Sequence, residues 1–239
     1  MELVRLILAG QTPPADSIAS VTELRLERSG ITDLRPLAAL THLRHLVLTR
    51  TFVTDLAPLA GLTELRRLEL TRSRIADVTP LAPLVHLQSL HLSFTAVRDV
   101  APLAGLFELE GCFLTGTLVD DIAPLAGLTR LERLDLGDTP IDDATPLAGL
   151  NRLRSLDLSG TRITDLAPLA GMAGLQYLDL TNTPVRDLSP LARLSELRRL
   201  DLRSTHPAGL SVLSHLPHCQ IITHPTPPRR RVRSASAPP

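Results

Sequence analysis

The chain has 239 residues, 44% of them hydrophobic, and its 25 arginines balance 25 acidic residues while lysine is absent. This composition predicts a soluble folded protein and excludes wholesale disorder. A net charge of zero argues against a protein that binds nucleic acid over its whole surface. Aromatic residues are scarce, with four Phe, one Tyr and no Trp.

The first 17 residues predict a helical N-terminal cap. Residues 1–10 form a short apolar segment interrupted by Arg5, and Glu2 stands where a secretory signal peptide would carry positive charge. No apolar run approaches the roughly 18 residues of a membrane-spanning helix. We therefore expect a cytoplasmic protein without a membrane segment.

A 22-residue repeat fills residues 18–215 and gives nine coils, of which the last is atypical. We number its positions from Ile18, which is position 1 of the first coil. Positions 1, 4, 7, 9, 14 and 20 are apolar in most coils, and position 9 is Leu in all nine. A fixed period of this length with L-x-x-L-x-L spacing is typical of leucine-rich-repeat solenoids.

One coil cannot bury its apolar side chains alone, so stability is expected from stacked neighbours and two end caps. Positions 6–10 alternate between outward and inward residues, which predicts a short strand in each coil and a parallel sheet on the concave face. The remaining residues are too few for a regular α-helix, which predicts 3-10 or irregular turns on the convex face. The predicted fold class is a leucine-rich-repeat solenoid of the α/β horseshoe type.

Two polar columns complete the repeat. Position 12 is Thr or Ser in every coil, and its hydroxyl can satisfy backbone groups where the chain leaves the sheet. Position 16 is Asp in eight coils and is followed three residues later by Pro in each of them. Because Asp is a favoured N-cap and Pro fits a first helical turn, this pair predicts the start of each convex turn.

The coil at residues 150–171, LNRLRSLDLSGTRITDLAPLAG, resembles the short leucine-rich repeats of the internalin family. The resemblance extends over about residues 18–215 and implies a bacterial solenoid that binds other proteins. Position 12 is usually Asn in that family, whereas it is Thr or Ser here. Similar arrays also occur as C-terminal sensor domains of bacterial NTP-driven signalling proteins.

The repeat ends in its ninth coil, where Pro207, Gly209 and Val212 replace the β-branched, Asp and Pro residues of the pattern. Residues 216–222 can supply a last strand that closes the core as a C-terminal cap. Residues 223–239 are rich in Pro, Arg and Ser and have no apolar period, which predicts a disordered tail.

The predicted tail carries four arginines, Arg229, Arg230, Arg231 and Arg233, beside Ser234. It could dock nucleic acid, an acidic partner or a kinase. A plain tail or linker is the more ordinary interpretation, since short basic stretches are common.

No catalytic motif is present, so we expect no enzymatic activity and no cofactor. Cys112 and Cys219 occupy apolar columns, which predicts buried thiols that form no disulfide with each other. His215, His218 and His224 lie near Cys219 in the sequence. Their spacing fits no established zinc pattern, so we expect no metal site.

The outward strand positions are the predicted partner-binding surface, because packing does not dictate their residue types. Exposed aromatic side chains are typical anchors of binding sites, and Gly111 and Gly116 flank Phe113 so that its ring is left uncovered. The alternative is that Phe94 and Phe113 pack on each other. The predicted partner-binding residues are Phe94, Phe113, His91, Val47, Phe52, Tyr177, Asp135, Asp157, Asp179, Asp201, Arg67 and Arg72.

Four of these residues, the aspartates, share position 8 of coils six to nine and should stack about 5 Å apart. They would repel one another unless Arg133, Arg199 or Arg203 intervenes. As a strip they predict recognition of basic groups or a cation, although L-D-L-S is a common strand sequence in leucine-rich repeats. With arginines in the first coils and aromatic residues in the middle, the concave face is predicted to be dipolar and to suit a protein partner.

We therefore expect a monomeric, non-catalytic interaction scaffold that binds a protein or peptide on its concave sheet, with Phe94 and Phe113 as anchors. A sensor or regulatory domain of a bacterial NTPase or effector signalling protein is the alternative. Nucleic acid is not the expected partner. A nucleic-acid binder acting through the arginine tail is a third hypothesis, which predicts an affinity that falls steeply with salt.

Overall fold

A computed structural model describes residues 2–214, 216 and 218–223. The predicted disordered tail therefore lies outside the described residues from position 224 onward.

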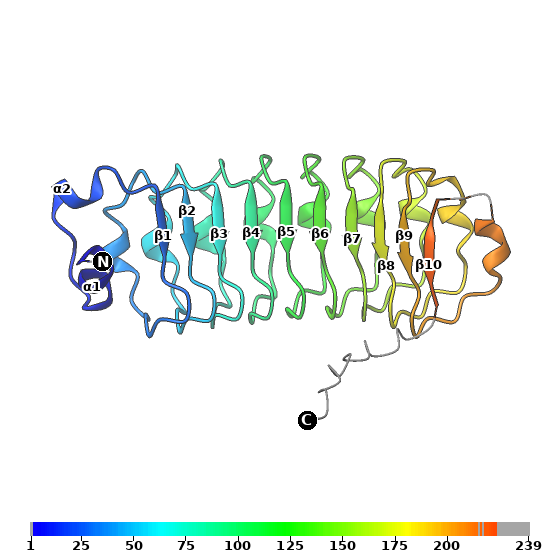
Figure 1. The fold of residues 1–239 in the computed structure, drawn as a ribbon, viewed down its shortest axis with the longest axis horizontal. Coiled ribbons are helices and arrows are strands. Elements are labelled where there is room, and N and C mark those ends of the chain that lie inside the picture. Colours follow the sequence, from blue (N-terminus) through cyan, green and yellow to red (C-terminus); the bar gives the residue numbers. More distant parts are fainter. Residues whose placement is uncertain (1, 215, 217, 224–239) are drawn as a thin grey trace, which may run out of the picture.

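Ten short strands form one parallel sheet in chain order (Figure 1). Neighbouring strands are in register, so that Leu46, for example, lies opposite Leu68. The predicted leucine-rich-repeat solenoid is confirmed. The strands are β1 (Glu23–Arg25), β2 (His45–Val47), β3 (Arg67–Glu69), β4 (Ser89–His91), β5 (Gly111–Phe113), β6 (Arg133–Asp135), β7 (Ser155–Asp157), β8 (Tyr177–Asp179), β9 (Arg199–Asp201) and β10 (Gln220–Ile222).

Two short helices, α1 (Glu2–Leu8) and α2 (Ala15–Ile18), precede the sheet. Ile7 of α1 is buried in the same core cluster as the leucines of the coils, and Leu3 and Val4 pack against that cluster. At the other end of the array, β10 pairs with β9. None of the helices within the described ranges has the length and apolar character required to cross a bilayer.

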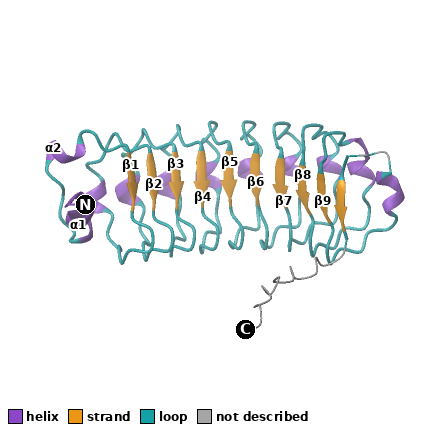
Figure 2. Ribbon diagram, in the orientation of Figure 1, coloured by secondary structure: helices purple, strands orange, loops and turns teal. Residues whose placement is uncertain are grey.

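A 3-10 helix lies behind the strands in each coil (Figure 2). Such helices need only bonds between residues three apart, which fits the few residues available. The predicted convex turns are confirmed. They are η1 (Arg35–Leu37), η2 (Ala57–Leu59), η3 (Thr79–Leu81), η4 (Ala101–Leu103), η5 (Ala123–Leu125), η6 (Thr145–Leu147), η7 (Ala167–Leu169), η8 (Ser189–Arg193) and η9 (Leu210–Leu213).

Seven apolar columns build one continuous core. In the third coil these are Leu62, Leu65, Leu68, Leu70, Ile75, Val78 and Leu81, each at most 1% exposed. Because neighbouring strands stack about 4.8 Å apart, each side chain packs against its equivalents in the coils on either side. Burial at about 1.5–3 kcal/mol for each such side chain makes these columns the main source of stability.

The hydroxyl column at position 12 ties each strand end to the turn that follows. The Thr139 hydroxyl donates to the carbonyl of Leu136 at 2.6 Å, and the Thr51 hydroxyl donates to the carbonyl of Leu48 at 2.7 Å. These hydroxyls are buried, so they satisfy carbonyls that water cannot reach. Ser73 is an exception, because its hydroxyl has no hydrogen-bond partner among the described residues.

The aspartate at position 16 caps the 3-10 helix from one residue earlier than predicted. Asp55 Oδ1 accepts the backbone N–H of Ala57 at 2.8 Å. The N-cap itself is Leu56, which makes no side-chain cap hydrogen bond. Leu56 stands at position 17, which is also one of the seven apolar columns, and its side chain is buried. The polar cap therefore has to come from the residue before it.

Position 11 has a left-handed backbone in all nine coils, which was not predicted. The φ angle is +58° at Phe94 and +64° at Gly116. In this conformation the N–H of Phe94 donates to the carbonyl of Thr115 in the next coil at 2.7 Å. The hydrogen bonding between coils thus continues beyond the end of the strand. It does so even where position 11 holds a bulky residue, for which a left-handed backbone is unfavourable.

The two cysteines differ in burial. Cys112 on β5 is fully buried, and burial raises the pKa of its thiol to about 12. Cys219, which precedes β10, is only partly buried, and burial raises its pKa as well. The prediction of a buried thiol is confirmed for Cys112. It is wrong for Cys219, because this residue precedes β10, which has a neighbouring strand on one side only among the described residues.

We expect Thr139→Val to lower the free energy of unfolding by about 1–3 kcal/mol, because the buried Leu136 carbonyl loses its partner while the side-chain shape is kept. Thr139→Ser retains the hydroxyl and is the matched control. Urea unfolding followed by circular dichroism measures both variants. An unchanged midpoint for the valine variant would contradict the capping role of this column.

One thiol of the folded chain should react with a chromogenic aromatic disulfide, and two should react after unfolding. The thiolate is the reactive species, so the buried, high-pKa Cys112 is protected while Cys219 is not. Cys219→Ser should abolish the reaction of the native protein. Rapid release of two equivalents in native buffer would show that Cys112 is accessible.

Candidate functional site

Parallel register lines up the position 8 side chains of successive strands on the concave face. Each side chain lies beside its equivalents on the two neighbouring strands, about 4.8 Å away at the backbone. The six residues contributed by β4 to β9 are His91, Phe113, Asp135, Asp157, Asp179 and Asp201.

Phe113 stacks on His91 and not on Phe94. The two ring centroids lie 4.2 Å apart and the ring planes differ by 13°. The Phe113 ring also lies over Gly111, where an added Cβ would come within 3.1 Å of it. The glycines were predicted to leave this ring uncovered; instead the missing side chain of Gly111 lets the ring lie against the strand, and Phe113 is half-buried. Burial lowers the pKa of His91, so the stack is uncharged at neutral pH.

Phe52 and Phe94 lie on the rim, where the chain leaves the sheet. Arg74 covers the Phe52 ring with its Cζ 4.8 Å from the centroid, and Arg72 covers the Phe94 ring at 4.9 Å. Phe94 is still 47% exposed, and its ring rests against Gly116 of the next coil. Phe94 and Arg72 therefore contact each other outside the line of position 8 side chains.

Val47 lies at an outward position of β2 but is buried, with 1% of its surface exposed, so the prediction that it is accessible to a partner is wrong. Its neighbours at position 8 are Arg25 and Glu69, whose opposite charges attract each other across it. Arg67 pairs with Glu69 at 3.1 Å, and Arg25 pairs with Glu27 at 3.3 Å. The predicted basic character of the N-terminal coils is reduced by these pairs.

A groove of about 310 Å³ opens on the concave face between β5 and β9. Arg133, Tyr177 and Arg199 line its side at position 6, and Tyr177 is half exposed. The small Ser155 lies between Arg133 and Tyr177 in the sheet and leaves space there. We call this site the acidic groove, and we define it by Phe113, Asp135, Asp157, Tyr177, Asp179 and Asp201.

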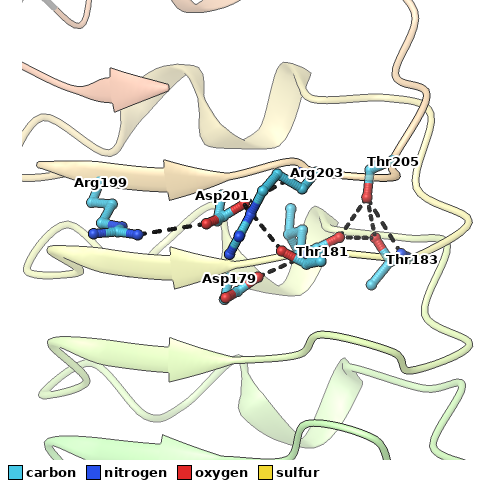
Figure 3. Close-up of polar contacts among 8 residues, drawn as sticks. Asp179, Thr181, Thr183, Arg199, Asp201, Arg203 and Thr205 are labelled. Carbon is cyan, nitrogen blue, oxygen red and sulfur yellow. Dashed lines mark hydrogen bonds and ion pairs between the residues drawn. The ribbon is translucent and has the colours of Figure 1, made fainter. Parts of the chain in front are cut away.

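Asp201, at one end of the acidic groove, is held by two arginines (Figure 3). Arg203 Nε donates to Asp201 Oδ1 at 2.8 Å, and the Thr181 hydroxyl donates to the same oxygen at 3.1 Å. Burial opposes ionisation, but these hydrogen bonds outweigh it and lower the pKa of Asp201. With 2% of its surface exposed, Asp201 is not the open carboxylate that the strip predicted.

One oxygen of Asp201 remains incompletely satisfied. Oδ2 is buried and has no hydrogen-bond partner within the described ranges, and its ion-pair contact with Arg199 is 3.6 Å long. This oxygen belongs to a side chain that lines the acidic groove.

Asp157 and Asp179 have weaker partners than Asp201. Asp157 Oδ1 accepts the N–H of Ser159 at 2.8 Å, and Asp179 Oδ1 accepts the N–H of Thr181 at 2.8 Å. Neither carboxylate forms an ion pair in the part of the chain that the structure describes. The predicted relief of repulsion by arginines thus takes the form of ion pairs at Asp201, and Arg203 also attracts Asp179 from a longer distance.

Burial raises the pKa of Asp157, and the neighbouring carboxylates of Asp135 and Asp179 raise it further. Hydrogen bonds from the side chain and the backbone of Ser159 lower the pKa but do not offset these effects. Ionised Asp157 is therefore less favourable in the folded chain than in the unfolded chain, and a cation in the groove would reverse this effect. The arrangement favours binding of a positively charged group.

Of the four residues at position 6 that line the groove, Tyr177 was predicted as a site residue, whereas Arg133, Ser155 and Arg199 were not. Arg133 and Arg199 were considered only as relief for the aspartates, and Ser155 was not considered. A comparison of position 6 with position 8 in each coil would have found them. Phe107 was also missed, and at 61% it is the most exposed of the large hydrophobic residues that the structure describes, outside the concave face.

Within the described residues, no group of three or more His, Cys, Asp or Glu side chains is arranged to hold a metal ion. His215 and His224, which were considered as ligands, lie outside those residues.

Comparison with known proteins finds leucine-rich repeats. A family profile described as "Leucine Rich repeats (2 copies)" matches residues 151–193. Among curated protein sequences nothing matches this chain.

Three solved structures illustrate the similarity of fold. An internalin (inlF) from Listeria monocytogenes is 28% identical with a TM-score of 0.81, over 93% of this chain and 74% of that one. An internalin C2 (inlC2) from the same species is 32% identical with a TM-score of 0.75, over 83% of this chain and 91% of that one. The ectodomain of the plant receptor kinase GASSHO1/SCHENGEN3 from Arabidopsis thaliana, in complex with CASPARIAN STRIP INTEGRITY FACTOR 2, is 20% identical with a TM-score of 0.66, over 84% of this chain and 29% of that one.

We expect Asp157→Asn to raise the thermal unfolding midpoint at neutral pH, because the amide keeps the acceptor for Ser159 and removes an unfavourable charge. Because the pKa of Asp157 is raised in the folded chain, its protonation contributes to the stability of wild type. This contribution is fully present below the ordinary pKa of 3.8 and is lost as the pH rises through the folded-state pKa. The gain should therefore be full at neutral pH and vanish below about pH 4.

The matched control for this prediction is Asp143→Asn. Hydrogen bonds from Thr145 lower the pKa of Asp143, so this substitution should lower the midpoint at neutral pH and have less effect in acid. Calorimetry across the pH range measures both variants. A midpoint that falls for Asp157→Asn would contradict the unfavourable charge in the groove.

Proposed function

The chain belongs to the internalin-like leucine-rich-repeat proteins of bacteria, and we propose that it is a non-catalytic scaffold that binds a polypeptide on its concave face. Leucine-rich repeats commonly mediate protein–protein interactions, and the plant receptor ectodomain of similar fold is in complex with CASPARIAN STRIP INTEGRITY FACTOR 2. The acidic groove is the proposed contact for a basic side chain of the partner. The regulatory-domain hypothesis, the cytoplasmic location and the monomeric state stay predictions.

The observation that carries the proposal is a pair of carboxylates, Asp157 and Asp179, that form no ion pair within the described ranges and line a groove of about 310 Å³. A lysine or arginine side chain in this groove would supply the missing positive charge. Its aliphatic stem would lie against Tyr177, whose exposed ring can also interact with the cation.

The aromatic stack beside the groove supports a polypeptide over a free cation. His91 and Phe113 continue the position 8 line directly from Asp135, and the imidazole is neutral at neutral pH. A peptide lying across the strands would therefore place a basic residue at the carboxylates and an apolar residue on Phe113. This combination of a hydrophobic anchor and an electrostatic contact is typical of protein recognition sites.

Peptides selected from a displayed random library on the full chain should be enriched in Lys or Arg next to an apolar residue. Their affinity should fall at least about tenfold for Asp157→Asn/Asp179→Asn, because the bound cation loses both charged partners. Phe113→Ala should act mainly by raising the dissociation rate. Surface plasmon resonance with synthetic copies of the selected peptides measures both effects.

The matched control is Asp120→Asn/Asp142→Asn, which changes the net charge equally at exposed residues outside the groove. It should leave the affinity within about twofold of wild type, since exposed charges at a distance are screened by salt. Selected peptides that bind the groove variant and wild type equally would place the binding surface elsewhere.

A further inference from the structure

The basic segment near the C-terminus has the chemistry that the acidic groove requires. Residues 224–239 contain Arg229, Arg230, Arg231 and Arg233 and no acidic residue. The groove contains Asp157 and Asp179 without ion pairs among the described residues. An arginine is suited to this site because its planar guanidinium can bond to carboxylates through two N–H groups.

The segment begins beside the groove. β10 pairs with β9, and Ile222 at the end of β10 lies opposite Asp201. The groove extends from there across β8 and β7 toward β5. The chain therefore leaves the last strand next to the carboxylate at the near end of the groove.

The covalent connection is long enough for the arginines to reach the unpaired carboxylates. Arg229 follows Ile222 by seven residues, which span at most about 25 Å when extended. β7, which carries Asp157, is three strands from β10, or about 14 Å at the usual spacing. The connection can thus cover the distance and still reverse its direction.

A second observation concerns the hydrogen bonding of a buried oxygen at the near end of the groove. Asp201 Oδ2 lies in a side chain that is only 3% exposed, and within the described ranges it has a 3.6 Å ion-pair contact with Arg199 but no hydrogen-bond donor. Buried carboxylate oxygens are usually hydrogen-bonded. This oxygen could therefore accept a hydrogen bond from a donor that enters the near end of the groove. An arginine from a segment starting opposite Asp201 would be placed to provide it.

We propose that the Arg229–Arg233 segment occupies the acidic groove of its own chain and competes there with an external basic polypeptide. The inference rests on the proposed function of the groove. A short tether holds the segment at an effective concentration of about a millimolar, so even a weak contact would be populated and would weaken external binding. Salt should release the segment, because the contact is electrostatic.

The test uses a fluorescent synthetic peptide of residues 226–234, TPPRRRVRS, and the full chain. In the tail variant, Arg229, Arg230, Arg231 and Arg233 are each replaced by Ala. Fluorescence anisotropy should give at least about tenfold tighter peptide binding to the tail variant than to wild type, because the groove is then free. Adding Asp157→Asn/Asp179→Asn to the tail variant should abolish binding, whereas adding Asp120→Asn/Asp142→Asn should not.

Three results would overturn the inference. Equal peptide affinity for wild type and the tail variant would show that the groove is not occupied by its own segment, while recognition of basic peptides in the groove would stand. Absence of peptide binding to the tail variant would show that this sequence does not fit the groove, whatever the randomly selected peptides do. A wild-type dimer that becomes monomeric in the tail variant, by sedimentation velocity, would place the segment in a second copy.

Discussion

Stacking of each coil on the next is the constraint on which every other feature of this protein depends. A single coil cannot bury its seven apolar side chains, so the equivalents in the neighbouring coils bury them. This requires parallel strands in register, as for Leu46, Leu68 and Leu90. Register also places each outward residue about 4.8 Å from its equivalent on the next strand. A charged side chain on the concave face therefore has little freedom to move away from an unfavourable neighbour.

Because stacking is periodic, the sequence predicts the columns well and the individual surface contacts poorly. Leu at position 9 behaves alike in every coil because its surroundings are alike. Val47 is covered because a cation and an anion flank it, and Phe113 lies against its strand because Gly111 leaves space there. These outcomes depend on which residues meet across two or three coils and on their rotamers. A single column of the repeat does not give this information.

The left-handed turn at position 11 shows how the array overrides local preference. Gly116, Asp138, Gly160 and Asn182 tolerate a positive φ, and these residue types could have predicted the conformation. Arginine at this position in the first three coils and Phe94 in the fourth conceal the pattern. They adopt the same backbone because the N–H must reach a carbonyl of the next coil. The exposed Phe94 ring on the rim is thus a consequence of backbone geometry as much as of its own chemistry.

The four aspartates of the concave face show how one repeated residue acquires different chemistry. Asp201 pairs with Arg199 and Arg203, and Asp135 accepts a hydrogen bond from the hydroxyl of Thr115, whereas Asp157 lies between two carboxylates with hydrogen bonds from Ser159. In a small domain such an unfavourable charge would use a large share of a marginal stability. Here a long apolar core shared by all coils offsets it, so the groove can retain a charge that only a bound cation would satisfy. Any occupant that supplies this cation must also stabilise the folded array, since binding and folding are thermodynamically linked.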